Sequence, residues 1–534
     1  MEGNFLRLMS DRYSNTDYDV AIIGLGPVGA TAANLLGRDG YKTTVIEREK
    51  DIYSKPRAIA FDHEIMRIFQ SIGLSEDVLP CTTRYRPALY LGIDGQIIRR
   101  IDPSPEPFQL HWMPNYLFDQ PCLETTLRKG IERFETVGVR LEHELVSLKQ
   151  EPDCIQLTIN DLKAETEYEI STRYVWACDG AGSPVRRSLG LTLEDLDFDE
   201  EWIVIDVKVN DTSTLPETNI QYCEPPRPST YVIGPGNHRR WELMLNPGET
   251  AEEISNEGRI LELLSRWGDP SNFNIWRAAV YRFHALVAEQ WSKGRIFLVG
   301  DSAHQTPPFM GQGMCQGIRD TNNLIWKLNQ VERFGGPESL FSHYQIERKP
   351  HVKALTEFTK SLGETICERD PEKAKIRDAR LIEELESGRM ETVRQGLIPN
   401  LVDGILHLEN GEPVGPAGRL FPQPTVDDGT KPDALLDDVL GRGFFMVTRD
   451  GSILKELSEE QLNWFEAVGG QAKVISETDS SLGLLRATNS VLSSFFDEWK
   501  SDLLLVRPDK YVFGAASDSS ETKALLDRLR EYLT

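Results

Sequence analysis

A glycine-rich turn close to the start of the chain constrains the fold more than any other feature. Residues 19–23 (DVAII) are apolar enough for a buried strand, and the segment GLGPVG follows them at once. Residues 43–46 predict a second strand, which ends on Glu47. In such a unit the glycines permit a tight turn and the close approach of a pyrophosphate, while the acidic residue meets a ribose hydroxyl. We therefore expect a Rossmann-like dinucleotide-binding domain, with the nucleotide bound by Gly24, Gly26, Pro27, Gly29, Glu47 and Arg48.

The segment 295–328 predicts another strand, loop and helix. Its apolar run, residues 296–299, is short enough for a buried strand and breaks at Gly300-Asp301. From Met314 onward the apolar residues fall near the helical period. The loop between them contains prolines and glycines, and a helix that starts after glycines presents unpaired N–H groups and a partial positive charge. We expect this helix end to attract an anion.

The whole string GDSAHxxPPxxGQGxxxGxxDxxNLxWKL resembles the second flavin-binding signature of the class A flavoprotein aromatic hydroxylases. In that family the aspartate, here Asp301, binds the ribityl chain of FAD, and the helix that starts near Gly313 points at the pyrimidine end of the flavin. Reduced flavin is an anion, and a helix N-terminus stabilises an anion. The resemblance implies that the cofactor is contacted by Asp301, Pro308, Gly311, Gly313 and Met314.

Other segments match the family's motifs in the family's order. The family's DG motif is matched by Asp179 and Gly180, with Arg186 after them, and its aspartate is implicated in binding both FAD and NAD(P)H. The resemblance also implies that Arg57 lies over the flavin or its pyrophosphate and that Gln120 contacts the cofactor. The alternatives are a solvated loop arginine at 57, a helix-cap neighbour at 120, and a turn held by an Asp–Arg pair at 179–186.

The nucleotide is expected to be FAD. Glu47 would repel the 2′-phosphate of NADP, and the chain has a single GxGxxG segment, so no separate nicotinamide domain is predicted. One fingerprint with a distant ribityl-binding segment suits one tightly held FAD. NADH or NADPH is then expected as a transient co-substrate.

A change of periodicity predicts a second structural unit between the flavin segments. From about residue 191 to 282 the pattern alternates with period two, as in 202–209 and 241–245, which favours an antiparallel sheet lying over the flavin. Residues 224–228 and 234–242 resemble the 3-(3-hydroxyphenyl)propionate hydroxylase branch of the class. The resemblance implies a phenolic substrate with an acidic side chain, such as 3-(3-hydroxyphenyl)propionate.

The resemblance also implies a reaction cycle. NAD(P)H reduces FAD, oxygen adds at the flavin C4a carbon to give a hydroperoxide, and one oxygen atom is delivered ortho or para to the substrate hydroxyl. Removing the phenolic proton requires a base or a proton relay. The sequence does not identify this base, since a Tyr or His in a strand is also a common core residue. His304 is expected to contact the flavin loop and not to act as the base. The candidate catalytic residues are His238, Tyr231, Arg240 and Pro308, with Tyr281 and His284 as further bases and Arg239 and Arg282 as further carboxylate ligands.

The predicted fold class is α/β. It combines a Rossmann-like FAD-binding domain, an inserted antiparallel substrate sheet like that of para-hydroxybenzoate hydroxylase, and a C-terminal thioredoxin-like domain. No cysteine follows Cys367, so the last domain has no CxxC motif and is expected to serve packing or dimerisation. The predicted divisions are 17–190 and 286–410 for FAD binding, 191–285 for the substrate sheet, 411–435 for a linker and 436–534 for the C-terminal domain.

Composition narrows the partners and the compartment. Lys and Arg number 59 against 84 Asp and Glu, a formal charge of −25, which argues against nucleic acid or an anionic membrane as a partner. The seven scattered cysteines suggest reduced thiols. The first 19 residues do not resemble a signal peptide, and no apolar run is long enough to span a bilayer. We expect a cytoplasmic protein that binds no metal and that can form a homodimer. Its expected partners are a phenolic substrate and O₂.

Two other functions remain open at this point. The same three motifs serve flavin-dependent epoxidases, Baeyer–Villiger oxygenases and reductases that act on polyketides. A flavin halogenase is disfavoured, because the WxWxIP motif is absent. A non-enzymatic alternative is a flavin-bearing scaffold whose thioredoxin-like tail recruits a partner.

Overall fold

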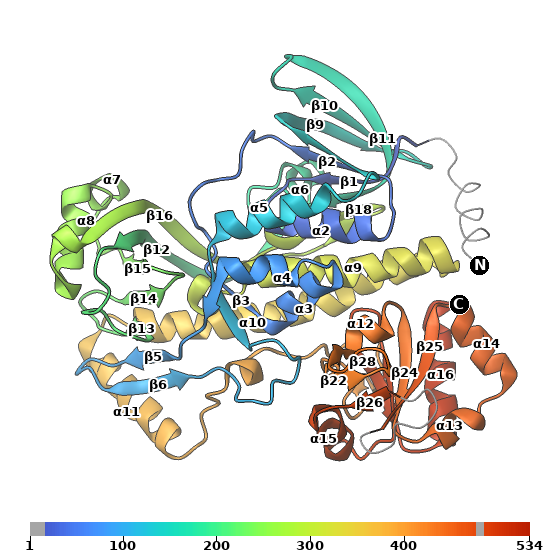
Figure 1. Ribbon diagram of the computed structural model, residues 1–534. Helices are drawn as coiled ribbons and strands as arrows, with labels where there is room; N and C mark the ends of the chain where they lie inside the picture. Colours follow the sequence, from blue (N-terminus) through green and yellow to red (C-terminus); the bar gives the residue numbers. More distant parts are fainter. Residues whose placement is uncertain (1–15, 477–484) are drawn as a thin grey trace.

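The fold is seen in a computed structural model that describes residues 16–476 and 485–534 (Figure 1). The start of the chain, where a signal peptide was not expected, lies mostly outside the described residues. The first sheet has the order β17-β18-β11-β1-β2-β8, and β9 and β10 extend it from β11. Its central strands run parallel. The strands are β1 (Tyr18–Ile23), β2 (Thr43–Glu47), β8 (Val137–Leu141), β9 (His143–Gln150), β10 (Ile155–Asp161), β11 (Thr166–Ala177), β17 (Ser292–Lys293) and β18 (Ile296–Leu298).

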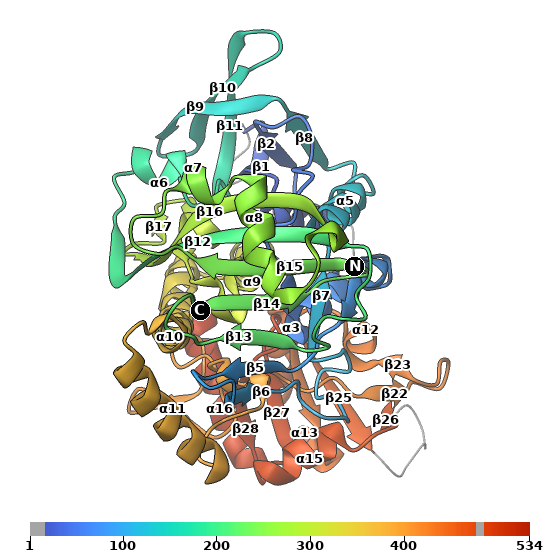
Figure 2. The same cartoon turned by 90° about the vertical axis from the view of Figure 1, so that its left-hand side faces the viewer.

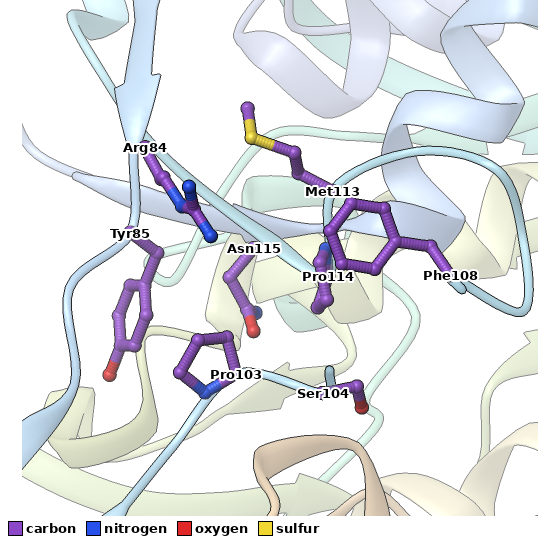
Figure 3. Close-up of a pocket in the computed structure, with 8 residues that line it drawn as sticks. All are labelled: Arg84, Tyr85, Pro103, Ser104, Phe108, Met113, Pro114 and Asn115. Carbon is purple, nitrogen blue, oxygen red and sulfur yellow. The ribbon is translucent and has the colours of Figure 1, made fainter. Parts of the chain in front are cut away.

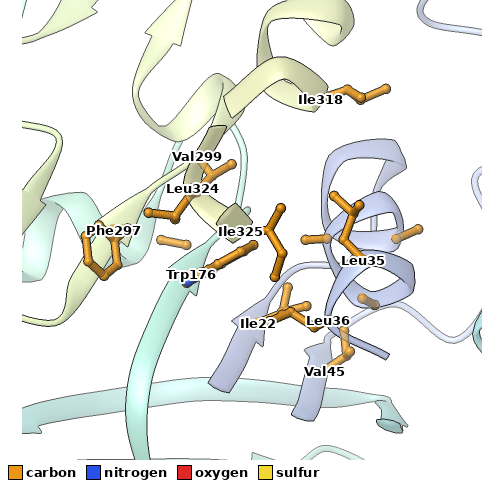
Figure 4. Packing of buried hydrophobic residues seen from close by; sticks show 14 of the residues in the cluster. Ile22, Leu35, Leu36, Val45, Trp176, Phe297, Val299, Ile318, Leu324 and Ile325 are labelled. Atoms are coloured by element: carbon orange, nitrogen blue, oxygen red, sulfur yellow. The ribbon is translucent and has the colours of Figure 1, made fainter. Parts of the chain in front are cut away.

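Helices cover this sheet and enclose its core. Figure 4 shows Leu35 of α2 and Ile325 of α9 meeting over Ile22, Val45 and Trp176 from the strands. A small sheet, in the order β3-β7-β4, packs beside it. The helices are α2 (Pro27–Arg38), α3 (His63–Ser71), α4 (Ser75–Val78), α5 (Gln120–Ile131), α6 (Pro184–Ser188), α9 (Gly313–Phe334) and α10 (Ser342–Cys367), and the small strands are β3 (Ala60–Asp62), β4 (Thr82–Arg84) and β7 (Asn115–Phe118).

Gly317 lets α9 approach α2 and the end of β18. A Cβ atom added at Gly317 would lie 2.6 Å from Val28 Cγ2 and 2.9 Å from Gly300 Cα. The second contact is with backbone, so no side-chain movement relieves it. The two glycine-rich segments are therefore held together by a contact that only glycine allows.

We expect Gly317→Val to lower the free energy of unfolding by about 3 kcal/mol, because overpacking costs about 1–3 kcal/mol and here the backbone must move. Urea denaturation measures the change. Asn322→Val, at a half-buried position of the same helix, controls for the helix propensity of valine and should cost less than about 1 kcal/mol. Equal losses in the two variants would contradict the close-contact explanation.

The second sheet is the predicted antiparallel unit, but it is wider than predicted. Its order is β19-β16-β12-β15-β14-β13-β5-β6, so two strands come from within the first predicted flavin segment. The pairing between β13 and β5 is parallel, and pairing between distant segments leaves no local sequence signal. The strands are β5 (Ala88–Leu91), β6 (Ile97–Ile101), β12 (Leu193–Val209), β13 (Asn219–Tyr222), β14 (Ser229–Ile233), β15 (His238–Met244), β16 (Phe273–Ala288) and β19 (His304–Gln305).

The two faces of this sheet have different neighbours. On the outer face, Ile205 and Trp241 pack with Ile260 of α8, which lies in front of the strands in Figure 2. On the inner face, Trp202 and Met244 pack with the 3-10 helix Pro308–Met310 and with α10. The inner face is therefore the one that meets the flavin segments. The helices of this region are α7 (Ala251–Ile254), α8 (Glu257–Leu264) and α11 (Pro371–Glu386).

The C-terminal unit has the expected thioredoxin-like order. Strands β25 and β24 are parallel, β27 and β28 continue the sheet antiparallel, and the helices lie between and after them. The predicted linker is partly wrong, because β22 and β23 pair into this sheet. Its elements are β22 (Thr425–Asp427), β23 (Ala434–Leu435), β24 (Phe444–Thr448), β25 (Gly470–Ser476), β26 (Leu485–Ala487), β27 (Leu503–Val506), β28 (Val512–Ala516), α12 (Leu436–Leu440), α13 (Gly451–Lys455), α14 (Glu459–Ala467), α15 (Val491–Glu498) and α16 (Ser519–Leu533), after a short hairpin of β20 (Leu408–Glu409) and β21 (Glu412–Pro413).

A buried ion cluster, made of Lys327, Glu347, Arg507 and Asp509, joins this unit to α9 and α10. Arg507 Nη2 lies 2.7 Å from Glu347 Oε2 and 2.6 Å from Asp509 Oδ2, and Lys327 Nζ lies 2.8 Å from the same Glu347 oxygen. Trp326 Nε1 donates to Asp509 at 3.0 Å. Because all four charges are buried, the C-terminal unit is fixed to α9 and α10 and is not a loosely attached tail.

The expectation of reduced cysteines is wrong for one pair. Cys81 and Cys122 form a disulfide, with their Cα atoms 5.6 Å apart. They lie 41 residues apart in sequence, and the fold brings the end of a 3-10 helix (Leu79–Cys81) to the start of α5. The other five cysteines, all within the described residues, are free.

Among the helices of residues 16–476 and 485–534, none has the length and apolar character needed to span a bilayer.

Candidate active site

The glycine-rich turn leaves the N-terminus of α2 open. Gly24 has a φ of +98°, and a Cβ there would lie 2.4 Å from the Cys178 carbonyl oxygen. A Cβ on Gly29 would lie 2.1 Å from the Gly24 oxygen, so both glycines are required by close backbone contacts. Gly26, by contrast, has no atom within 4 Å of its Cβ direction and caps α2, which begins at Pro27, without a side-chain hydrogen bond. This open helix end suits a pyrophosphate.

Glu47 and Arg48 have different surroundings. The Glu47 carboxylate accepts from Leu25 N at 2.7 Å and from Glu49 N at 2.8 Å, so it ties the end of β2 to the glycine turn. The Arg48 side chain is 68% exposed and pairs with Glu49 at 3.2 Å. The structure thus brings Glu47 to the nucleotide turn, but it does not hold Arg48 there.

Gln120 shapes the loop that carries Arg57. Its Oε1 accepts from Arg57 N at 3.0 Å and from Ala58 N at 2.6 Å, and its Nε2 donates to Glu124 at 2.6 Å. The Arg57 side chain is 53% exposed and lies 4.0 Å from Glu124. The Arg57 side chain is therefore accessible to a cofactor, while the Gln120 side chain is occupied by hydrogen bonds within the protein.

The DG segment joins the first flavin segment to the second. Asp179 Oδ2 accepts from Val185 N at 3.0 Å, whereas its Oδ1 is buried without a partner. Burial raises the pKa of Asp179. Arg186 donates to the Ser302 carbonyl at 2.8 Å and to the Ala181 carbonyl at 2.8 Å, so it links this loop to the residue after Asp301. The unpartnered carboxylate oxygen is available to a ligand.

Asp301 stands at the end of β18, at the same edge of the sheet. It is exposed, yet the surrounding protein raises its pKa, and the charges of His304 and Arg57 oppose this rise. Because the charge of Arg57 acts on the Asp301 carboxyl, the loop that carries Arg57 and the loop that carries Asp301 face each other. His304 itself is a structural anchor, because its Nε2 lies 2.7 Å from Asp320. Asp320 also accepts from Gly300 N at 3.1 Å, which fixes the turn before Asp301.

The N-terminus of α9 is open and firmly anchored. The Gln312 side chain accepts no hydrogen bond from the backbone N–H groups of the first turn, and Gly313 has no atom within 4 Å of its Cβ direction. Arg319 donates to Gln312 Oε1 at 3.0 Å and also pairs with Asp62 and Glu64. The preceding Gly311 has a φ of +59°, Met314 is half-buried, and Pro308 starts the short 3-10 helix. The sequence did not reveal this anchor, because Asp62 and Arg319 lie far apart in the chain.

Asp206, on the inner face, accepts contacts from three nitrogen-bearing side chains. His238 Nε2 lies 2.8 Å from it, Arg240 Nε donates at 2.7 Å, and Arg277 Nη1 donates at 3.2 Å. Burial would raise the pKa of Asp206, but Arg240 and His238 outweigh burial and hold it at about 2. The guanidinium of Arg240 is therefore occupied by Asp206 and by the loop backbone, which leaves it little freedom to bind a substrate carboxylate. His238 is bonded through Nε2 alone, and its Nδ1 is buried without a hydrogen-bond partner.

The same arginines hold the loop that carries Arg57. Arg240 Nη1 donates to the Arg57 carbonyl at 2.7 Å, and Arg277 Nη1 donates to the Pro56 carbonyl at 2.9 Å. Their observed contacts therefore position a flavin loop. Neither Asp206 nor Arg277 was singled out from the sequence, since a charged residue in an alternating strand gives no sign of what it contacts.

Several other predicted side chains lie away from this group. Tyr231 packs on the outer face against Trp241, with ring centroids 5.3 Å apart, and its hydroxyl donates to the Pro216 carbonyl. Arg282 is 52% exposed and pairs with Asp199 and Glu201. Also outside the group are Arg239, which donates to backbone carbonyls, and His284, which lies 3.7 Å from Asp199. Tyr281, by contrast, does contact the Asp206 group, because the Arg277 guanidinium lies over its ring, 5.0 Å from the centroid.

Aromatic side chains gather beside the Pro308–Met310 turn. The ring of Phe309 lies 5.7 Å from Trp202, 5.8 Å from Phe198 and 6.1 Å from Phe283, measured between centroids. They come from the inner face of the sheet and from the flavin loop. An aromatic ring bound here would find edge and face contacts of the kind that aromatic pairs prefer.

A separate small pocket lies at the start of β7. Figure 3 shows that Tyr85 and Asn115 border it, together with Pro103 and Phe108. Its volume is about 20 Å³, enough for about one water molecule. It is therefore too small for a phenol or a flavin.

Comparison with known proteins agrees with these features. A model of an FAD-binding domain family matches residues 17–359, and a model of the HcaD C-terminal domain matches residues 418–531. A probable NADH-specific resorcinol 4-hydroxylase of Rhodococcus jostii is 34% identical over 521 residues, covering 96% of this chain and 94% of the relative. A 3-(3-hydroxy-phenyl)propionate/3-hydroxycinnamic acid hydroxylase of Escherichia coli is 31% identical over 525 residues, covering 96% and 94%.

Solved structures show the same fold. The flavin-dependent monooxygenase PieE, in complex with FAD and substrate, has a TM-score of 0.78 at 20% identity and covers 97% of this chain and 99% of its own. Aklavinone-11 hydroxylase, with FAD and aklavinone, has a TM-score of 0.77 at 19% identity and covers 97% and 100%. The predicted fold class is thus confirmed. Because the FAD-binding family model covers more than half of the chain, and relatives above 30% identity align over nearly all of it, the chain belongs to the class A FAD-dependent aromatic hydroxylases.

Proposed function

We propose that the protein is an FAD-dependent monooxygenase that hydroxylates a hydroxyphenyl-alkanoic acid, or a closely similar phenol, ortho or para to its hydroxyl, using NADH and O₂. The observation that carries this proposal is the meeting of the glycine turn, the DG loop and the Asp301 segment at one edge of the first sheet. The relatives' names, resorcinol hydroxylase and hydroxyphenylpropionate hydroxylase, support a phenolic substrate, and one of them supports NADH.

The residues present fit FAD. The open N-terminus of α2 suits the pyrophosphate, and the unpartnered Asp179 oxygen and exposed Asp301 suit the hydroxyls of the cofactor. The open N-terminus of α9 at Gly313 suits the anionic pyrimidine end of a reduced flavin. When bound, FAD supplies the oxygen-activating chemistry of the reaction.

The chain itself has three tasks in this reaction. The Asp206 group fixes the 56–57 backbone, and Asp320 fixes the turn at Gly300, so the loops around the flavin are held before substrate arrives. The aromatic side chains around Phe309 orient the substrate ring and exclude water from it. We infer that the aromatic ring of the substrate lies between Phe309 and the inner face of the second sheet.

A panel of phenols tests the proposal. With FAD-loaded protein and NADH, 3-(3-hydroxyphenyl)propionate or resorcinol should accelerate NADH oxidation, and the product should contain one additional oxygen atom. A benzene analogue without the hydroxyl, 3-phenylpropionate, is the matched control and should give no hydroxylated product. If no phenol were hydroxylated while a ketone or an alkene was oxygenated, the epoxidase or Baeyer–Villiger alternative would replace this proposal.

Several sequence predictions stay predictions. These are the cytoplasmic location, the homodimer, and the absence of nucleic-acid partners. Size-exclusion chromatography with light scattering measures the oligomeric state directly.

A further inference from the structure

Glu242 occupies a distinctive place on the inner face of the sheet. On β15 it alternates with Arg240 and Met244, so it points to the same side as both. Across the sheet it is paired with Val204 and Thr230. Arg240 belongs to the group that holds the flavin loop, and Met244 packs in the aromatic region beside Phe309. Glu242 therefore lies between the flavin loop and the aromatic side chains.

The Glu242 carboxyl is buried without a hydrogen-bond partner. Only 6% of the residue is exposed, and the nearest cation is Arg240, whose Nη1 lies 3.9 Å away. Within the described residues no hydrogen bond to this carboxyl is formed, and Arg240 is already bound to Asp206 and to the loop carbonyls. A buried carboxyl without hydrogen-bond partners costs free energy, so its presence requires an explanation, such as a catalytic role or a bound molecule.

A second polar atom close by is also unpartnered. Trp202 is fully buried, and its Nε1 has no acceptor. Trp202 pairs with Met244 across β12 and β15, one position along the inner face from the pair formed by Val204 and Glu242. Its ring contacts Phe309 on the flavin loop. A free acceptor and a free N–H donor thus lie on neighbouring strands, on the same face, beside an aromatic group.

We propose that Glu242 is the base that removes the substrate's phenolic proton and that Trp202 Nε1 donates a hydrogen bond to the resulting phenolate oxygen. This assignment rests on the proposed function. In the step, the phenol O–H bond breaks, its proton joins a Glu242 carboxylate oxygen, and the electron pair stays on the phenol oxygen. No oxidant or reductant takes part. The negative ring is then the better nucleophile toward an electrophilic oxygen.

The electrostatic surroundings suit this role. Burial raises the pKa of Glu242 to about 7, with Arg240 and Arg277 lowering it and Asp206 raising it. These are the charged groups that face Glu242 from β15, β16 and β12, and β14 contributes the uncharged Thr230. A base with a pKa near the working pH accepts a proton and releases it again efficiently.

Glu242→Gln is the direct test, because it keeps the shape of the side chain and removes the base. At pH 7.5, hydroxylation of 3-(3-hydroxyphenyl)propionate should fall about 100-fold or more, the usual contribution of a general base. In the wild type kcat should rise with pH through about 7, because only the ionised carboxylate accepts the proton, and the variant should lose this rise. Glu201→Gln, an exposed position on β12, is the control and should match the wild type.

A binding measurement gives a readout independent of turnover. 4-Nitrophenol differs in colour between its phenol and phenolate forms, so its absorption spectrum when bound reports the proton's position. The wild type should bind it as phenolate at a lower pH than Glu242→Gln does. Glu242→Asp keeps a carboxylate and should restore part of the hydroxylation rate if the glutamine variant folds poorly.

The outcomes separate the two proposals. If Glu242→Gln hydroxylated at the wild-type rate with the same pH profile, and bound nitrophenol in the same form, Glu242 would not be the base. If the wild type hydroxylated no phenol, the proposed function would fail whatever the variant did. If both variants bound FAD normally and only Glu242→Asp kept activity, the assignment would stand.

Discussion

Replacing Arg507 with methionine is expected to lower the free energy of unfolding by about 3–5 kcal/mol, the cost of removing one partner from a buried ion pair. Arg507 neutralises both Glu347 and Asp509, and none of the three has access to water. Methionine keeps most of the volume but leaves Lys327 as the one cation paired with these acids in the described residues. Their other hydrogen bonds come from the uncharged groups of Asn323, Trp326 and the Ile405 backbone. Urea denaturation at pH 7 measures the loss.

The pH dependence of that loss provides a second check. Burial alone would raise the pKa of Glu347, but Arg507 and Lys327 outweigh it and hold the pKa at about 2, below the ordinary value of 4.5. A depressed pKa stabilises the folded state above about pH 4.5, and this stabilisation is lost as the pH falls toward 2. The difference between wild type and Arg507→Met should therefore shrink in acid.

A surface pair provides the matched control for Arg507. Arg449 pairs with Asp497 and Asp502, and its side chain is 37% exposed. Arg449→Met should change stability by less than about 1 kcal/mol, because exposed ion pairs contribute little. If the two variants lost equal stability, or if the Arg507 loss did not depend on pH, the buried cluster would not be what fixes the C-terminal unit.

Replacing Asp301 with alanine is expected to weaken FAD binding about 10- to 100-fold. A hydrogen bond to a charged group contributes about 1.5–3 kcal/mol, and each 1.4 kcal/mol is about a tenfold change in affinity. Asp301 is exposed at the end of β18, so its removal leaves the core intact and should change the unfolding free energy little. Fluorescence titration of the apoprotein with FAD measures the affinity.

Two further variants serve as controls for the Asp301→Ala result. Asp301→Asn keeps an acceptor and should lose less affinity than Asp301→Ala. Asp153→Ala removes an exposed carboxylate between β9 and β10, outside the segments predicted to bind FAD, and should bind FAD like the wild type. An Asp301→Ala protein with unchanged affinity would show that the ribityl chain lies elsewhere.

Local patterns explain why much of the flavin site could be predicted from the sequence. The glycine turn, Glu47 and the Asp301 loop each belong to a strand–turn–helix unit whose signals lie within about 30 residues. Close contacts at Gly24 and Gly29 show why these positions require glycine. Arg48, although adjacent to Glu47, points to solvent, because the residue after a strand end is not constrained to the same side.

The substrate side could not be predicted in the same way. Whether His238 and Arg240 were free or occupied depended on Asp206, more than 30 residues earlier and opposite them across a sheet. The face on which Tyr231 lies depended on register, which a shift of one residue would reverse. The disulfide between Cys81 and Cys122 likewise depended on tertiary packing alone.

The C-terminal unit is more closely integrated with the flavin domain than its composition indicated. Tyr511 donates to Glu64 at 2.9 Å, and Glu64 in turn pairs with Arg319, which holds the cap of α9. The unit therefore supports α9, the helix whose N-terminus is proposed to face the flavin. The absence of a CxxC motif agrees with such a structural role.

A crystal structure of the protein with FAD tests most directly whether three separated segments form one flavin site. The pyrophosphate should lie at Gly26, the ribityl hydroxyls should lie within hydrogen-bond distance of Asp301, and the pyrimidine ring should face the backbone N–H groups that begin near Gly313. FAD bound with Asp301 remote from the ribityl chain, or with the helix end at Gly313 facing solvent, would contradict this arrangement.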